Sequence, residues 1–180
     1  MGNPLALMLG PGKLKLAASL STPEPTDLAS AWNAGFLDLG YTDAGSTVTL
    51  ETNFEDVEVA EELEPVLIAA TKRTVTIEFA LAEITATNLK RVMNGGTITS
   101  GGGYVYYDPP ALGAEQYCML GWESDDLTER WIFRKCIQTG SVGVARQKSP
   151  NKSTFPVQYR GVKPPSLNSF RAIYASPGRA

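Results

Sequence analysis

Residues 72–107 read KRTVTIEFALAEITATNLKRVMNGGTITSGGGYVYY, and strand, helix and strand signals follow one another there without a break. Over 74–81, apolar residues alternate with polar or small ones, which is typical of a strand with one buried face. Over 85–94, apolar residues recur at helical spacing behind a threonine that can cap the first turn. Asn-Gly-Gly then ends the helix, and 97–99 and 104–107 are expected to be short strands.

Further strand patterns lie on both sides of this unit. The expected strands cover 13–20, 36–41, 46–54, 115–122, 129–138, 141–146 and 153–162. The pair 115–122 and 129–138 predicts a hairpin, with Trp131 and Phe133 on one face and Ile132 on the other. One short helix among many strands predicts a mainly β fold, a β-sandwich or partial barrel with one flanking α-helix.

Length and composition favour one domain. A chain of 180 residues with 43% apolar residues can bury one core and is too short for two ordinary domains. We expect a domain over 13–163, with an N-terminal arm over 1–12 and a C-terminal arm over 164–180. The apolar patch near the start has no basic residue before it, unlike a secretory signal, and no apolar run is long enough to span a membrane.

An acidic stretch interrupts the strand patterns. Residues 55–64 carry six carboxylates, Glu55, Asp56, Glu58, Glu61, Glu62 and Glu64, and few apolar residues. Such a segment fits poorly in a protein interior, so residues 43–65 are expected to project as an acidic loop.

Charge is divided along the chain, although the net charge is only −3. Residues 17–71 hold eleven acidic residues and no basic one, and residues 130–180 hold ten basic residues and no acidic one. Two interpretations remain open. The halves neutralise each other within one fold, or an acidic surface of one copy meets a basic surface of another, which favours head-to-tail association.

The sequence offers little for catalysis, metal binding or nucleic-acid binding. It contains no histidine, which excludes His-dependent triads and His-ligated metals. The two cysteines, Cys118 and Cys136, lie in apolar strand patterns and are expected to be buried free thiols in a reducing compartment. Neighbouring Arg and aromatic residues in the last third point to opposite faces of their strands, which disfavours a single-strand binding groove. We expect no enzyme activity, no cofactor and no metal.

Several strings resemble a known family when taken in order. They are VEVAEELEPV (57–66), RTVTIEFAL (73–81), AEITATNLKRVMNGG (82–96), MLGWE (119–123), ERW (129–131) and GSV (140–142). Together they resemble the major tail tube protein of bacteriophages with long, non-contractile tails, in particular phages of actinobacterial hosts. The resemblance covers most of residues 16–163.

The resemblance implies a β-sandwich with one flanking helix, whose inner sheet joins a continuous β-barrel built from several copies. It implies hexameric rings that stack into a tube and conduct double-stranded DNA without binding it specifically. It also implies a virion protein that is made in the host cytoplasm, with tape measure, tail terminator and baseplate proteins as partners. Two alternatives are a different ring-forming phage protein, such as a tail terminator or head-decoration protein, and a cellular β-sandwich binding module.

By the same resemblance, the acidic stretch takes the place of a stacking loop between rings, and the two end segments take the place of arms between rings. The expected contact residues between copies come from three regions. They are Glu55, Asp56, Glu58, Glu61, Glu62 and Glu64, then Arg146, Lys148 and Lys152, and finally Leu167, Phe170, Ile173 and Tyr174. The sequence does not assign Tyr104, Tyr106 and Tyr107 to core, lumen or subunit contact.

Overall fold

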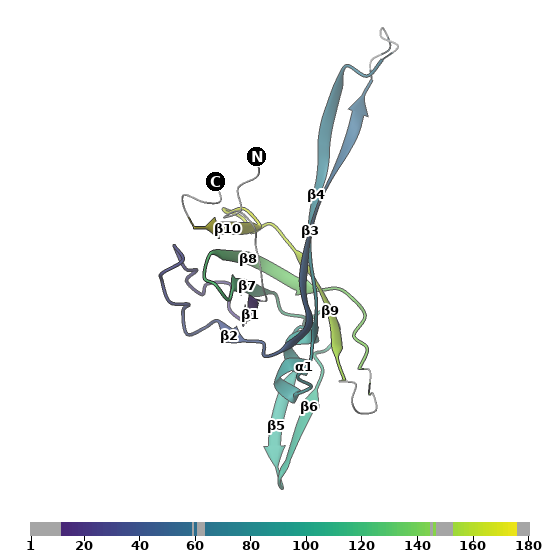
Figure 1. Cartoon of the computed structure of the whole chain (residues 1–180). Coiled ribbons are helices and arrows are strands. Elements are labelled where there is room, and N and C mark those ends of the chain that lie inside the picture. Colours follow the sequence, from purple (N-terminus) through teal and green to yellow (C-terminus); the bar gives the residue numbers. More distant parts are fainter. Residues whose placement is uncertain (1–11, 59, 61–63, 145, 147–152, 176–180) are drawn as a thin grey trace.

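The structure is a computed structural model (Figure 1) and describes residues 12–58, 60, 64–144, 146 and 153–175. Its elements are β1 (Gly12–Ala17), β2 (Leu37–Asp38), β3 (Thr42–Val57), β4 (Leu67–Leu81), α1 (Ala86–Val92), β5 (Thr97–Gly101), β6 (Tyr104–Asp108), β7 (Cys118–Ser124), β8 (Glu129–Gln138), β9 (Phe155–Gly161) and β10 (Phe170–Tyr174). The main sheet has the order β2-β1-β7-β8-β9-β4-β3, with β10 also paired to β8, and β5 and β6 form a separate ribbon. The predicted fold class, mainly β with one flanking helix, is confirmed.

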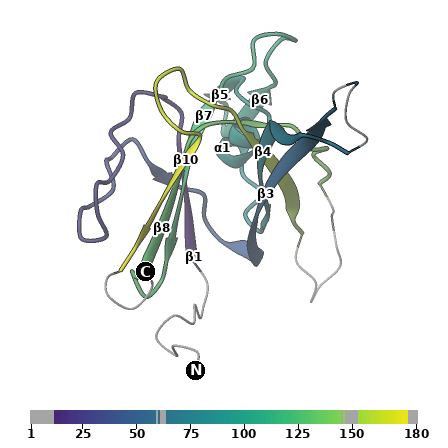
Figure 2. The same ribbon diagram turned by 90° about the horizontal axis from the view of Figure 1, so that it is seen from above.

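Strand β8 divides the main sheet, because two strands share one of its edges. The first part of β8 pairs with β10 and its last part pairs with β9. Figure 2 shows the result: β1, β7, β8 and β10 lie together in one layer, while β3 and β4 lie in another. Steeply crossed sheets that share a strand are one way to close a sandwich around a core.

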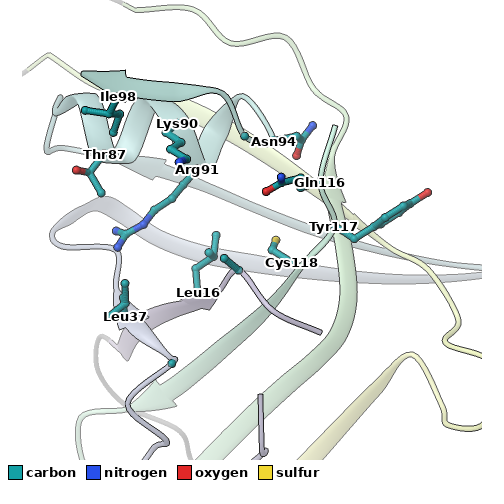
Figure 3. A pocket seen from close by; sticks show the side chains of 13 residues that line it. Leu16, Leu37, Thr87, Lys90, Arg91, Asn94, Ile98, Gln116, Tyr117 and Cys118 are labelled. Atoms are coloured by element: carbon teal, nitrogen blue, oxygen red, sulfur yellow. The ribbon is translucent and has the colours of Figure 1, made fainter. Parts of the chain in front are cut away.

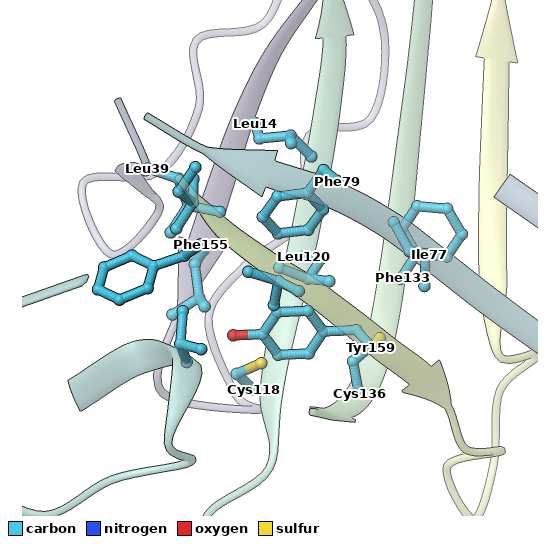
Figure 4. Close-up of a cluster of buried hydrophobic side chains, with 14 of the residues drawn as sticks. Leu14, Leu39, Ile77, Phe79, Cys118, Leu120, Phe133, Cys136, Phe155 and Tyr159 are labelled. Carbon is cyan, nitrogen blue, oxygen red and sulfur yellow. The ribbon is translucent and has the colours of Figure 1, made fainter. Parts of the chain in front are cut away.

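The main core fills the space between the two layers (Figure 4). Leu120 and Phe133 come from the first layer, and Ile77, Phe79 and Tyr159 come from the second. The rings of Phe79 and Tyr159 stack with their centroids 5.9 Å apart. Burial of each side chain of this size contributes about 1.5–3 kcal/mol, so this cluster is the main source of stability.

A second cluster covers the outer face of the first layer. The irregular segment between β1 and β2 places Trp32 and Phe36 against Met119 and Ile132. The Trp32 ring lies directly over Gly121, where a side chain on β7 would collide with it. Both faces of β7 and β8 are therefore covered.

The alternation predicted for the β7–β8 hairpin is confirmed. Trp131 and Phe133 pack in or against the main core, whereas Ile132 belongs to the second cluster. The two strands pair directly, with Leu120 opposite Phe133.

A buried ion pair fastens the irregular segment to the sheet. Arg130 of β8 and Glu123 of β7 are opposite each other in register, and the Arg130 Nε donates to Glu123. The Arg130 Nη1 also donates to the carbonyl oxygens of Asp27 at 2.7 Å and Ser30 at 2.6 Å. The Trp32 Nε1 donates to the same Glu123 carboxylate at 2.7 Å. These groups satisfy one another, as buried charges require.

Helix α1 forms where the sequence predicts it. The Thr85 hydroxyl caps its first turn by accepting from the backbone N–H of Asn88 at 3.1 Å. Beyond the helix, Asn94 and Gly95 adopt positive φ angles of 56° and 126°, which suits Asn and Gly and few other residues.

The acidic stretch differs in form from the expected loop. Residues 43–57 belong to β3, which pairs with β4 from Thr42 and Leu81 out to Val57 and Leu67. The register shifts twice, between Thr42 and Ser46 near the body and between Asn53 and Phe54 toward the tip. The result is a long β-hairpin that projects from the body at one end of the molecule (Figure 1).

Two further segments also differ from expectation. The strand predicted over 141–146 is wrong, because residues 141–144 and 146 are not part of any strand. The expected C-terminal arm contains β10, which pairs with β8 from Phe170 opposite Phe133 to Tyr174 opposite Glu129. The expected N-terminal arm lies outside the described residues, except for Gly12, which begins β1.

Candidate assembly surfaces

The β3–β4 hairpin carries the acidic candidate residues at its projecting end. Glu55 and Asp56 lie on β3, and Glu58 and Glu64 flank the tip; all four are exposed. None of them forms an ion pair with another described residue. Glu61 and Glu62 lie outside the described residues. The hairpin end is therefore a surface of carboxylates that are not neutralised by the described part of its own chain.

Large apolar side chains lie among these carboxylates. Phe54, Val57, Val66, Leu67 and Ile68 are all exposed, Phe54 by 62% and Ile68 by 63%. A contiguous apolar surface rimmed by polar groups usually marks a place where another protein binds. The sequence reasoning missed these residues as contact candidates, although apolar residues inside a carboxylate-rich segment were a usable signal.

The connection between β8 and β9 is basic in sequence and leads to the end of β4 that lies away from the hairpin tip. Phe155, the first residue of β9, pairs with Leu81, the last residue of β4, so the β8–β9 connection enters the second layer away from the hairpin tip. This connection holds Arg146, which is exposed, while Lys148 and Lys152 lie outside the described residues. The two ends of the second layer therefore differ in charge.

The apolar candidates near the C-terminus pack mainly on their own chain. Phe170 stacks on Trp131 of β8, with ring centroids 5.5 Å apart, and Tyr174 meets the same ring edge-on at 6.4 Å. Ile173 packs against the second cluster. Leu167, in the turn before β10, remains 51% exposed.

One carboxylate of the acidic half pairs with basic residues of the last third within the same chain. Glu24 of the acidic half accepts from Arg134 at 3.0 Å and pairs with Arg171 at 3.6 Å. The structure therefore supports the first interpretation for Glu24, whereas the hairpin carboxylates make no such pair. The described candidate residues do not gather in one place, but divide between the two ends of the second layer and the segment 167–174, which includes β10.

The structure also has an apolar hollow of about 330 Å³ between α1 and the β1–β7 strands (Figure 3). Arg91, at its side, donates to the carbonyl oxygen of Asp38 and to the Asn88 side chain, both at 3.0 Å. Partial burial lowers the pKa of this guanidinium. Because Arg91 is occupied in holding α1 against β2, we assign no chemistry to this hollow.

The two cysteines are free and buried, as predicted. Cys118 and Cys136 lie opposite each other on β7 and β8, beside the Tyr159 ring (Figure 4). Burial raises the pKa of the Cys118 thiol to about 12 and also raises the pKa of Cys136.

We expect the folded protein at pH 8 to react with a thiol-specific alkylating reagent at least ~100-fold more slowly than the urea-unfolded chain, because the reactive thiolate is scarce. Mass spectrometry over time would measure this difference, and equal rates would contradict the burial.

Metal and membrane features are absent from the part of the chain that the structure describes. No group of three or more acidic, Cys or His side chains there could hold a metal ion. Within the same residues, no helix is long and apolar enough to cross a membrane.

Comparison with known proteins identifies the family. Residues 7–161 match the family described as phage tail tube protein, so the chain belongs to this family. It is accordingly a structural component of a virion tail. A comparison with curated protein sequences finds no match.

Two solved structures resemble the chain weakly. One is a chain of the six-fold symmetrised baseplate of the anti-feeding prophage, with 11% identity and a TM-score of 0.44 over 98% of this chain and 100% of that chain. The other belongs to a native gene transfer agent particle, with 10% identity and a TM-score of 0.34 over 91% and 95% of the two chains. The family assignment rests on the sequence match.

Proposed function

We propose that this tail tube protein assembles into hexameric rings that stack head to tail, and that the phage genome passes through the lumen of the resulting tube. The observation that carries the proposal is the β3–β4 hairpin, which projects from the body with exposed apolar side chains and carboxylates that lack partners within the described chain. Such a surface is complete only when another molecule covers it. Because the tube repeats one subunit, the covering molecule is a second copy.

An open sheet edge also supports repeated association. Strand β3 lies at the end of the main sheet, and in the described chain its outer edge has no partner strand along 16 residues. An exposed edge of this length is prone to pair with another chain, and closure into a barrel removes such edges. In the proposed ring, a neighbouring copy covers this edge.

Charge gives the stacking a direction. The carboxylates of the hairpin, namely Glu55, Asp56, Glu58, Glu61, Glu62 and Glu64, are proposed to meet the connection that carries Arg146, Lys148 and Lys152 in the next ring. Leu167 and β10, with Phe170, Ile173 and Tyr174, are proposed to contribute contacts between copies beside the arms over 1–12 and 164–180. Opposite charges at the two ends favour head-to-tail over head-to-head contact.

The proposed place in the virion follows from the tube. The tape measure, tail terminator and baseplate proteins are its proposed partners, and double-stranded DNA passes without specific binding. Carboxylates that line a lumen repel phosphates and let DNA slide.

Negative-stain electron microscopy of the purified protein over a concentration series tests the proposal. We expect long hollow tubes of stacked rings with six-fold end views. Raising salt from about 0.1 M to about 1 M shortens the screening length from about 10 Å to about 3 Å and should shorten the tubes. Finite rings alone would indicate a terminator or decoration protein, and a monomer at every concentration would contradict tube assembly.

A further inference from the structure

The β5–β6 ribbon presents two tyrosines to solvent. Tyr106 lies opposite Thr99 and Tyr104 opposite Gly101, so both rings are on one face of the ribbon, with centroids 6.4 Å apart. They are 54% and 68% exposed. Two neighbouring aromatic rings exposed to this extent are more than a folded monomer requires.

The other face of the ribbon is anchored to the body. Tyr107 is half-buried, and its hydroxyl donates to the carbonyl oxygen of Gly95 at 2.9 Å. Burial raises the pKa of this hydroxyl. Tyr107 thus holds the ribbon next to the end of α1, and Tyr104 and Tyr106 point away from that anchor.

The ribbon and the β3–β4 hairpin lie at opposite ends of the molecule. Strand β4 runs from the hairpin tip at Leu67 to Leu81, and α1 and the ribbon follow Leu81. Figure 1 shows the two projections pointing in opposite directions. Phe155, which ends the basic β8–β9 connection, lies opposite Leu81, so the connection enters the second layer at its ribbon end.

The hairpin carries an apolar stripe that continues the core-facing side of β3 and β4. Val48 lies opposite buried Ile77, and two and six residues further along β3 the same face carries Leu50 and Phe54. Ile68 lies diagonally across from Phe54, within reach of its ring. Beyond the body nothing in the described chain covers Phe54 and Ile68, which are both mostly exposed.

We propose that the exposed face of the ribbon, Tyr104 and Tyr106, is the docking surface for the hairpin stripe, Phe54 and Ile68, of a second copy in the adjacent ring. The lengths are similar: beyond the register shift at Asn53 and Phe54 the hairpin has four paired residues on each strand, about 13 Å, and each ribbon strand has five, about 17 Å. Because the two surfaces are different and lie at opposite ends, each copy can use both, and the contact repeats without closing. The inference rests on the proposed tube and names the side chains that join its rings.

Disulfide trapping between two chains tests this contact directly. Proteins carrying Ile68→Cys or Tyr106→Cys are mixed, assembled and mildly oxidised. Because Cys118 and Cys136 are buried, they do not interfere. We expect a disulfide-linked dimer on a non-reducing gel from the mixture, and none from either variant alone.

A double variant of the ribbon measures how much its two exposed tyrosines contribute to tube formation. We expect Tyr104→Ser/Tyr106→Ser to raise the concentration needed for tube formation at least ~10-fold, because the variant removes the apolar area that both aromatic rings bury in the contact. Tyr41→Ser removes a tyrosine that is 79% exposed on another part of the surface and should leave that concentration unchanged.

The outcomes separate this inference from the proposed function. Suppose that the wild type forms tubes, that no dimer is trapped, and that Tyr104→Ser/Tyr106→Ser forms tubes at the wild-type protein concentration. These results would overturn the ribbon contact and would not contradict the proposed tube. A disulfide-linked dimer from Ile68→Cys alone would place the stripe against itself, and one from Tyr106→Cys alone would place the ribbon against itself. Either result would also overturn the ribbon contact. Wild-type protein that never forms tubes would overturn the proposed function and this contact together.

Discussion

Replacing Arg130 with methionine is expected to lower the free energy of unfolding by about 3–5 kcal/mol, because it leaves the Glu123 carboxylate buried beside the sheet without its cation. The carbonyl oxygens of Asp27 and Ser30 lose their donor in the same variant. Urea titration followed by tryptophan fluorescence measures the loss, since Trp32 binds the same carboxylate.

Two companion variants show whether the buried charge is the cause. Arg130→Met/Glu123→Leu removes both charges and should recover about 1–2 kcal/mol of that loss. Lys15→Met breaks the 2.5 Å ion pair between Lys15 and Asp38, in which the Asp38 side chain is 65% exposed. Loss of this exposed pair should lower the free energy of unfolding by less than about 1 kcal/mol. A double variant no more stable than Arg130→Met would show that packing around the guanidinium, rather than charge, matters.

Shortening the β3–β4 hairpin is expected to abolish tube formation and leave the monomer folded. Replacing residues 54–71 with a two-residue Asn-Gly turn closes the hairpin at the pair of Asn53 and Lys72, the last pair before the register shift. The removed side chains include exposed Phe54 and Ile68 and none of the buried core. Electron microscopy reports the loss of tubes, and circular dichroism with thermal unfolding reports the intact body.

A charge-only variant separates the two parts of this hairpin surface. Glu55→Gln/Asp56→Asn/Glu58→Gln/Glu64→Gln retains the full length and the apolar stripe. We expect it to form tubes at a higher protein concentration than the wild type and to lose most of the dependence on salt. Tubes formed by the shortened protein at wild-type concentrations would show that the hairpin is not a stacking element.

The sequence predicts well those elements that are buried within one chain. The alternation over 74–81 and 129–138 and the capped helix after Thr85 all reflect burial against the chain's own core. The pattern fails where a strand is exposed on both faces. Residues 54–57 of β3, with Phe54 followed by two carboxylates, show no alternation because no described part of their own chain covers them.

The wrong strand over 141–146 has a different cause. Val142 does pack against the core, which explains the alternating pattern. A strand also needs continuous backbone pairing, however, and the pairing of this part of the chain with β9 ends at Gln138 opposite Tyr159, after which, among the described residues, only Thr139 and Gly140 donate to the Gln158 carbonyl oxygen. A local pattern does not report where the backbone pairing of a strand ends. The contact candidates near the C-terminus are ambiguous for a similar reason, because an apolar segment that packs on its own β8 looks the same as one that packs on a neighbour.

The order of the strands in the sheet has a consequence for how the chain folds. Strand β1 pairs with the nearby β2 at only two positions, whereas its six-residue pairing is with β7, where Leu16 lies opposite Leu120. This longer pairing must wait until more than a hundred further residues have been made. The three hairpins, β3–β4, β5–β6 and β7–β8, need only local contacts and form without that delay. The covering of β8 by β10 follows the three hairpins, because β10 lies C-terminal to all of them. Slow closure of distant strands around quickly formed hairpins gives the newly made subunit a period in which its projecting hairpin already exists while its body is still incomplete.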